Sequence, residues 1–283
     1  MIGVDSEFNF IADIISLLGR DAGSKLSVEI GDDAAITEVV NSPLVISTDS
    51  AIEGIHFSDT LMSAFETGYS TFSAAISDLA AMGANCLFAT VNITAKNSTD
   101  LSWFRDAYLG IRQCGLDNGI HVVGGNTSRA DQRTFHYTVI GSKSKHGSLL
   151  RSNAKVGEEI WVSGVIGAAY LGYLLRGGED VPGSPSQHKA FISRFVQLEP
   201  RVRLGQELVA NGLSSCAIDT SDGILQDIAH IAKASEVTAQ IDYESLPFAL
   251  PKFREEQQIR FGGDYELAFT SNASNHDLLS KLG

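Results

Sequence analysis

Short apolar runs that are typical of strands alternate with stretches of helical periodicity along nearly the whole chain. Apolar residues at successive or alternate positions predict strands, and apolar residues three or four positions apart predict helices. The predicted strands are residues 43–49, 87–94, 120–123, 134–140, 159–164, 215–219, 237–242 and 266–270. The predicted helices are residues 6–19, 64–83, 101–118, 166–176, 201–211 and 223–235, the second with a possible interruption at 77–78. This alternation indicates an α/β (or α+β) fold with two domains.

A polar loop at residues 141–148 separates the two sets of elements. We therefore expect an N-terminal domain of residues 1–145 and a C-terminal α/β domain of residues 146–283. The 283 residues of the chain suffice for two domains of ordinary size.

The overall charge and the cysteine content narrow the class of protein. A formal net charge of −13 makes nucleic acid and anionic membranes poor partners. The three cysteines are far apart and form no CxxC pair, which indicates neither a zinc site nor a disulfide framework. The N-terminus has the pattern of an amphipathic helix and not of a signal peptide, and no apolar stretch is long enough to span a membrane. A cytoplasmic protein is the expectation.

Acidic, hydroxyl and glycine residues gather in five short clusters, most of them near predicted strand ends. The clusters are Gly31–Ala34, Ser47–Asp49 with Glu53–Phe57, Ser77–Asp78, Asp219–Gly223 and Gly262–Glu266. Mg²⁺ prefers oxygen ligands and completes its shell with water and phosphate, while glycine lets the backbone approach phosphate oxygens. Taken singly, each cluster is more often a helix cap or a turn, and Ser77–Asp78 and Ser221–Asp222 are each expected to precede a helix. The case for a Mg²⁺–phosphate site rests on the clusters together.

Several familiar nucleotide motifs are missing from the sequence. It contains no GxxxxGK[ST] loop, no HRD or DFG motif, no HExxH and no GxSxG. Residues 164–167 follow a predicted strand and open a helix, but they lack the glycine spacing of a dinucleotide fingerprint. These absences argue against P-loop enzymes, protein kinases and NAD- or FAD-dependent enzymes.

An ordered series of motifs resembles the thiamine-monophosphate kinase family, in the superfamily of aminoimidazole ribonucleotide synthetase and selenophosphate synthetase. The series covers about residues 7–270 and is far more specific than any one motif. It consists of GDDA at 31–34, STD at 47–49, EGIHF at 53–57, SDLAAMGA at 77–84, VGGNT at 123–127, LRS at 150–152, EPR at 199–201, IDTSDG at 218–223 and GDYEL at 263–267.

The resemblance implies two α/β domains, with the N-terminal domains of two chains forming a shared β-barrel in a homodimer. ATP and several Mg²⁺ ions would bind in a cleft between the domains. The reaction would transfer the γ-phosphoryl group of ATP to the phosphate of thiamine monophosphate, giving thiamine diphosphate.

The resemblance also implies roles for individual residues. The positions that match metal ligands are Asp32, Ser47, Thr48, Asp49, Asp78 and Asp219. The positions that match nucleotide contacts are Gly125, Asn126, Arg151 and Ser221, and those that match substrate contacts are His56 and Asp222. No catalytic residue is expected beyond those that position metal and phosphate. The attacking phosphate oxygen is already anionic, so metal ions and the always-charged Arg151 would only have to neutralise and align two polyanions.

Three features depart from the family pattern. The family has Asp where this chain has Asn126, and a Glu in the Gly-Gly-Glu-Asp motif at the position of Gly263. The family also continues past the position of Gly283 with a segment whose aromatic residue packs on thiamine, so the family's C-terminal end is expected to be missing. Two alternatives stay open: another ATP-dependent enzyme of the same superfamily, or a nucleotide-binding relative without turnover. Selenophosphate synthetase is disfavoured because the first cysteine is Cys86.

Overall fold

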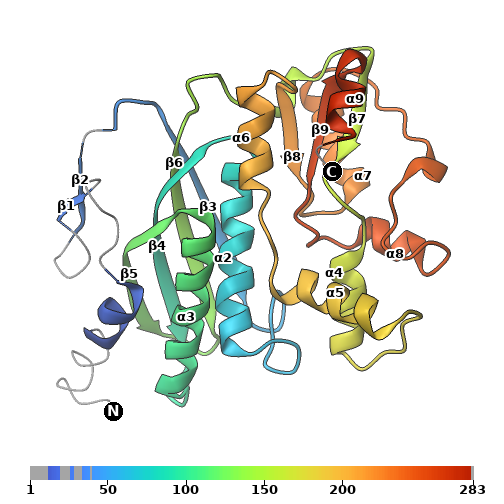
Figure 1. Cartoon of the computed structure of the whole chain (residues 1–283). Coiled ribbons are helices and arrows are strands. Elements are labelled where there is room, and N and C mark those ends of the chain that lie inside the picture. Colours follow the sequence, from blue (N-terminus) through green and yellow to red (C-terminus); the bar gives the residue numbers. More distant parts are fainter. Residues whose placement is uncertain (1–11, 20–25, 29–33, 39, 282–283) are drawn as a thin grey trace. The chain divides into compact units, whose positions relative to one another are not determined.

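The computed structural model describes residues 12–19, 26–28, 34–38 and 40–281. Two compact units are distinguished, the first formed by residues 1–75 and 86–142 and the second by residues 76–85 and 143–283 (Figure 1). The expected division at 145/146, with its separate roles for the two domains, stays a prediction.

The first unit is built on a mixed four-stranded sheet with the strand order β3-β6-β4-β5. Strands β3 and β6 are antiparallel, whereas β4 and β5 are parallel. A separate short antiparallel pair joins β1 to β2. The strands are β1 Leu26–Val28, β2 Ile36–Thr37, β3 Leu44–Ile52, β4 Asn85–Ala95, β5 His121–Arg129 and β6 Thr134–Ser142. In the described residues the main sheet is open, and a barrel shared by two chains stays a prediction.

Helices α2 (Ala64–Ala81) and α3 (Leu101–Asn118) lie against one face of this sheet (Figure 1). Their backbones touch, because a Cβ atom on Gly68 would lie 2.0 Å from the carbonyl oxygen of Ala107. Phe72 of α2 stacks on Tyr137 of β6 with ring centroids 5.2 Å apart, and both side chains are fully buried. Aromatic packing between helix and sheet therefore forms the core of the first unit.

The second unit contains an antiparallel three-stranded sheet with the order β7-β9-β8 and several helices. The strands are β7 Glu158–Val162, β8 Cys216–Asp219 and β9 Leu267–Asn272. The helices are α4 Ala168–Arg176, α5 Pro185–Val196, α6 Val202–Ala210, α7 Ile224–Ala234, α8 Glu255–Arg260 and α9 His276–Leu279. Buried isoleucines of α7 pack against β8 and β9 in one continuous apolar cluster.

Most predicted elements are confirmed, and among the described helices that the sequence analysis missed, α5 is the longest. The Ser184 side chain accepts a hydrogen bond from the amide of Gln187. The side-chain oxygen of Gln187 accepts one in turn from the amide of Ser184. Pro185 occupies the first turn, where its missing N–H costs nothing. Ser184 and Gln187 therefore form a capping box, which is the sequence signal for the start of this helix.

Two expectations about elements are wrong, and one predicted strand is longer than expected. Residues 77–78 lie inside α2, which continues without interruption to Ala81, and so they do not precede a helix. The strand predicted at 120–123 is observed as β5 and continues to Arg129, so the GGNT stretch at 124–127 pairs with β4. Residues 237–242 alternate in burial but belong to no strand. In the two strand segments, a neighbouring backbone, present for 124–127 and missing for 237–242, decides the structure.

None of the helices in the described part of the chain has the length and apolar character that crossing a membrane requires.

Candidate functional site

Strand β3 presents the three expected metal ligands Ser47, Thr48 and Asp49 in succession. Successive side chains of a strand point to opposite faces, so Ser47 and Asp49 share one face and Thr48 lies on the other. The Thr48 hydroxyl donates a hydrogen bond to the carbonyl oxygen of Tyr137 at 2.8 Å. Asp49 Oδ1 accepts a hydrogen bond from the amide of Ser50 at 2.6 Å. Two side chains from this motif can therefore face one ion, and Thr48 could add only its backbone oxygen.

Strand β5 carries Gly125 and Asn126, the expected nucleotide contacts of the first unit. A Cβ atom on Gly125 would lie 2.1 Å from the carbonyl oxygen of Val91, so parallel pairing with β4 itself requires glycine here. Asn126 is exposed and its Nδ2 donates to Ser128 Oγ at 3.0 Å. Strands β3 and β5 are the two outer strands of the main sheet, so these residues and Ser47–Asp49 lie on its opposite edges. Asp32, the remaining expected ligand, lies outside the described residues.

His56 lies in an exposed loop that Arg133 holds in place. The Arg133 guanidinium pairs with Glu53 and, at 2.8 Å, with Asp59, and it lies 4.6 Å from the ring centroid of Trp103. His56 Nδ1 accepts a hydrogen bond from the amide of Ile52 at 3.0 Å. The ring proton of neutral His56 is therefore on Nε2. Glu53 has a structural role, and its pKa is lowered by the hydrogen bond from Arg133.

In the second unit, Asp219 at the end of β8 lies close enough to Asp78 of α2 for their charges to interact. Asp219 is 3% exposed. Burial and, second to it, the charge of Asp78 raise the pKa of Asp219 to about 6, and the guanidinium of Arg151 opposes this shift. The backbone of Arg151 is fixed by the Ser235 hydroxyl, which donates to its carbonyl oxygen at 2.8 Å. The structure thus brings together three of the expected residues, two acidic and one basic.

Asp227 belongs to the same acidic cluster, and the sequence analysis did not single it out. Its side chain is 1% exposed, and its Oδ2 accepts a hydrogen bond from the amide of Asp222 at 3.3 Å. Burial raises the pKa of Asp227 to about 7, and the charges of Asp222 and Asp219 contribute. An aspartate in the first turn of a helix usually only complements the helix dipole, which is why the sequence did not distinguish it.

Ser221 and Asp222 form the turn between β8 and α7. A Cβ atom on Gly262 would lie 2.0 Å from the carbonyl oxygen of Ser221, so the glycine pair at 262–263 packs directly on this turn. Asp222 is exposed and lines a cavity of about 470 Å³ together with Leu225, Tyr243 and Arg260. A cavity of this size falls within the range of small-molecule sites.

The acidic residues of the fifth cluster have structural roles. Asp264 Oδ2 accepts from the amide of Gly167 at 2.6 Å and its Oδ1 accepts from the amide of Ala169 at 3.0 Å. Asp264 therefore caps the N-terminus of α4, the helix that residues 164–167 open. Glu266 is almost fully buried and forms ion pairs with Arg194 at 2.6 Å and Arg201 at 2.7 Å.

The buried Asp264 predicts a pH-dependent stability. Its pKa is raised to about 6, chiefly by burial, which outweighs the two amide hydrogen bonds. The folded state therefore binds more protons than the unfolded state between about pH 4 and 6. For this reason the free energy of unfolding falls as the pH rises through that window. In the wild type, ionisation of Asp264 lowers the free energy of unfolding between pH 4.5 and 7. In Asp264→Asn this decrease should be smaller by on the order of 2 kcal/mol. Denaturant unfolding of both proteins at the two pH values measures this, and identical pH dependences would show that Asp264 is already ionised at pH 4.5.

The acidic residues of the two units suit Mg²⁺ better than a metal ion whose ligands all come from the protein. Among the described residues, no group of three His, Cys, Asp or Glu side chains is arranged to hold a metal ion. Mg²⁺ needs only one or two carboxylates because water and substrate phosphates complete its octahedral shell. The adjacent carboxylates of Asp78 and Asp219 repel one another when both are charged, and a divalent cation would relieve that repulsion.

Known proteins resemble this chain over most of its length. Residues 31–142 match the family model described as AIR synthase related protein, N-terminal domain. The thiamine-monophosphate kinase of Escherichia coli (strain K12) is 33% identical over 283 residues, covering 96% of this chain and 85% of that protein. The crystal structure of thiamine-monophosphate kinase from Stenotrophomonas maltophilia K279a has a TM-score of 0.84 and 33% identity, covering 98% of this chain and 89% of that one. A structure described as AaThiL complexed with AMPPCP and TMP has a TM-score of 0.75 at 24% identity, with coverage of 96% and 86%, and shows the same fold.

The match over residues 31–142 and the mixed α/β fold define a protein of the AIR synthase-related class. Within that class, the chain belongs to the thiamine-monophosphate kinase family. The resemblance carried by the motif series is therefore confirmed, while the roles of individual site residues stay predictions.

Proposed function

We propose that this chain is a kinase that transfers the γ-phosphoryl group of ATP to the phosphate of thiamine monophosphate, giving thiamine diphosphate and ADP. The observation that carries the proposal is the 33% identity to the Escherichia coli thiamine-monophosphate kinase over 96% of the chain. The ATP analogue AMPPCP and TMP in the complex of AaThiL support the same pair of substrates.

The proposed metal ligands are Asp32, Ser47, Thr48, Asp49, Asp78 and Asp219. Bound Mg²⁺ would neutralise the phosphates and hold them in line for transfer. The buried Asp219 and the half-buried Asp78 repel each other when both are charged, which supports a cation at that point. Asp227 is proposed as a positioning residue, because its carboxylate holds the amide of Asp222 in the turn that precedes α7.

The proposed nucleotide contacts are Gly125, Asn126, Arg151 and Ser221. Arg151 is exposed while its backbone carbonyl is held by Ser235, which supports a role of its charge toward phosphate oxygens. No general base is required, since the accepting phosphate oxygen already carries negative charge at neutral pH.

His56 and Asp222 are the proposed thiamine-side contacts. His56 offers a free Nε2–H donor from an exposed loop, and Asp222 lines a cavity of about 470 Å³. We expect His56→Ala to raise KM for thiamine monophosphate roughly tenfold, since one lost hydrogen bond to a charged group costs about 1.5 kcal/mol, with KM for ATP unchanged. Initial rates at varied concentrations of each substrate test this, with His146→Ala, an exposed histidine of another loop, as control. A rise in KM for ATP alone would place His56 at the nucleotide instead.

A homodimer and a cytoplasmic location complete the proposal. Leu44 and Ile46 on β3 are 50% and 62% exposed on one face of the sheet, which supports a second chain covering them. All three cysteines are buried free thiols, which supports a reducing compartment.

The proposal is tested by measuring ADP and thiamine diphosphate together. Purified protein with Mg²⁺ and ATP is incubated with thiamine monophosphate, with unphosphorylated thiamine or with no acceptor. We expect ADP and thiamine diphosphate in equal amounts with thiamine monophosphate only. ATP binding without any product would favour the alternative of a nucleotide-binding relative without turnover, which the amide at Asn126 and the glycine at 263 would motivate.

A further inference from the structure

The turn that carries His56 follows strand β3 and is closed by its own backbone. The amides of Ile55 and His56 donate to the carbonyl oxygen of Ile52 at 3.1 and 2.9 Å. The amide of Gly54 donates to the carbonyl oxygen of Phe57 at 2.8 Å, and the φ of Gly54 is 82°, in the left-handed region that favours glycine. Gly54, Ile55 and His56 are all exposed. Because water competes for exposed hydrogen bonds, such a turn needs further contacts to keep one shape.

Arg133, which directly precedes β6, supplies those contacts. The amide of Glu53 donates to the carbonyl oxygen of Arg133 at 3.0 Å, and the amide of Arg133 donates to Glu53 Oε2 at 3.2 Å. The guanidinium of Arg133 also pairs with Glu53 and forms two parallel hydrogen bonds with Asp59, at 2.9 and 2.8 Å. Since Glu53 begins the turn and Asp59 follows it, these three side chains form a clamp across the turn.

The clamp is fixed to the aromatic core of the first unit. The Arg133 guanidinium lies 4.6 Å from the ring centroid of Trp103. Trp103 and Phe57 both pack on Phe135, with ring centroids 5.8 and 5.5 Å from its own. Phe57 and Phe135 are buried. The residue next to His56 is therefore tied to the same core as the clamp.

Arg133 is itself poorly suited to binding a substrate phosphate. Its side chain is 9% exposed. Two carboxylates and the ring of Trp103 surround its guanidinium, so its charge is already neutralised and shielded from solvent. Arg133 can therefore influence substrate binding through the turn that it holds, and not by direct contact.

We propose that Arg133 is a positioning residue, which holds the turn at His56 in the shape that binds thiamine monophosphate. This inference rests on the proposed function and on the proposed contact of His56 with the substrate. His56 Nδ1 accepts a hydrogen bond from the amide of Ile52, so the shape of the turn also sets the direction of the Nε2–H donor. A turn that is ordered before the substrate binds costs less free energy on binding. A turn that is ordered for only a fraction of the time weakens the apparent affinity by that fraction.

The first test is Arg133→Met, which keeps the length of the side chain and removes both ion pairs. We expect KM for thiamine monophosphate to rise about tenfold, with kcat and KM for ATP within about twofold of the wild type. Adding His56→Ala to Arg133→Met should change KM by less than about twofold, because both substitutions remove the same contact. Without substrate, the amides of residues 54–56 should exchange hydrogen at least about tenfold faster in Arg133→Met.

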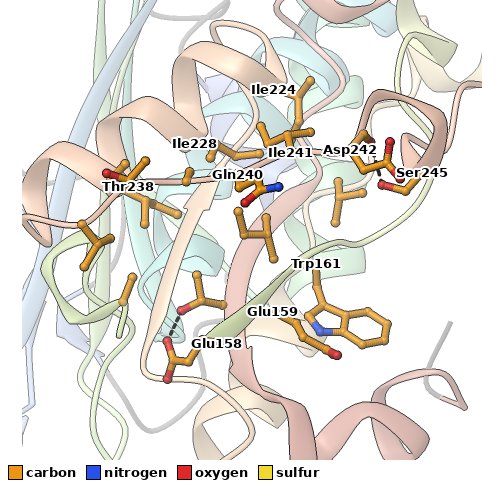
Figure 2. A pocket seen from close by; sticks show the side chains of 18 of the residues that line it. Glu158, Glu159, Trp161, Ile224, Ile228, Thr238, Gln240, Ile241, Asp242 and Ser245 are labelled. Carbon is orange, nitrogen blue, oxygen red and sulfur yellow. Dashed lines mark hydrogen bonds between the residues drawn. The ribbon is translucent and has the colours of Figure 1, made fainter. Parts of the chain in front are cut away.

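Asp59→Asn tests the clamp with less risk to the fold, because Arg133 keeps its pair with Glu53. It should raise KM for thiamine monophosphate by about threefold, less than the loss of both pairs. The control is Glu159→Gln, which removes a carboxylate that pairs with His276 at 2.9 Å. Figure 2 shows Glu159 on β7 among the residues that line an apolar cavity of the second unit. This control should leave KM unchanged.

The results separate this inference from the proposed function. A wild type that forms no thiamine diphosphate would refute the proposed function, and the inference with it. An active wild type whose two clamp variants keep its KM, or lose only kcat, would show that Arg133 merely stabilises the fold. Multiplied effects of Arg133→Met and His56→Ala on KM would also overturn the inference, because Arg133 would then act independently of His56. If Arg133→Met does not fold, Asp59→Asn alone decides.

Discussion

Asp219→Asn should reduce thiamine diphosphate formation at least about 100-fold while leaving the protein folded and more resistant to unfolding. The substitution keeps the shape of the side chain but removes the charge that a cation at Asp78 and Asp219 needs, and lost electrostatic stabilisation of a transition state commonly costs this much. The same change relieves the burial of a charge beside Asp78, which raises the pKa of Asp219 to about 6. The free energy of unfolding without metal should therefore rise by on the order of 1–2 kcal/mol at pH 7.

Two measurements on the same samples check this result. The kcat is measured with saturating ATP, thiamine monophosphate and Mg²⁺, and thermal unfolding is measured in the presence of a chelator. Asp277→Asn changes an exposed carboxylate of the same unit and should alter neither quantity. If Asp219→Asn retains more than about a tenth of the wild-type kcat, Asp219 is not a metal ligand, because loss of a required charge costs roughly 100-fold or more.

Glu266→Gln should lower the free energy of unfolding by roughly 3 kcal/mol. Glu266 is 3% exposed at its side chain and neutralises two guanidinium groups, those of Arg194 and Arg201, which are 20% and 25% exposed. Removing one partner of a buried ion pair leaves an uncompensated charge, which is far more costly than losing a pair in water. A fall of this size corresponds to a Tm lower by about 6–12 °C.

The natural comparison is Glu207→Gln, which breaks an ion pair with Arg203 of similar length, 2.9 Å, on an exposed helix surface. That substitution should change the free energy of unfolding by less than about 0.5 kcal/mol. Denaturant unfolding of the two variants and the wild type measures the changes in the free energy of unfolding. The dependence of that free energy on denaturant concentration should be the same in all three proteins. Equal effects of Glu266→Gln and Glu207→Gln would mean that the Glu266 network contributes no more than a surface pair.

The fold was predictable from the sequence wherever apolar periodicity and burial agree. Helix α3 was expected at 101–118 and is observed at Leu101–Asn118, because its buried face follows the helical period. The segment 237–242 shows the limit of such patterns, since it has the alternation of a strand but no neighbouring backbone with which to pair along its length. Periodicity reports which face is buried, whereas a strand also needs a hydrogen-bonding partner.

The candidate site was only partly predictable, because acidic residues look alike in a sequence whether they bind ligands or support the fold. The cluster at 262–266 was grouped with the others, yet Asp264 caps α4 and Glu266 neutralises two arginines. Conversely, Asp227 looked like an ordinary helix residue and lies buried among the acidic residues of the second unit. Long-range contacts, 97 residues apart in the case of Gly167 and Asp264, decide these roles.

The central claim is direct transfer of the terminal phosphoryl group of ATP to the phosphate of thiamine monophosphate. The most direct test follows ATP labelled with ³²P in its γ-phosphate, in the presence of Mg²⁺ and thiamine monophosphate, with the products separated by chromatography. The account predicts that all transferred label appears in thiamine diphosphate, in a one-to-one ratio with ADP. Label that appears only as inorganic phosphate, or ATP that is bound and never cleaved, would contradict it.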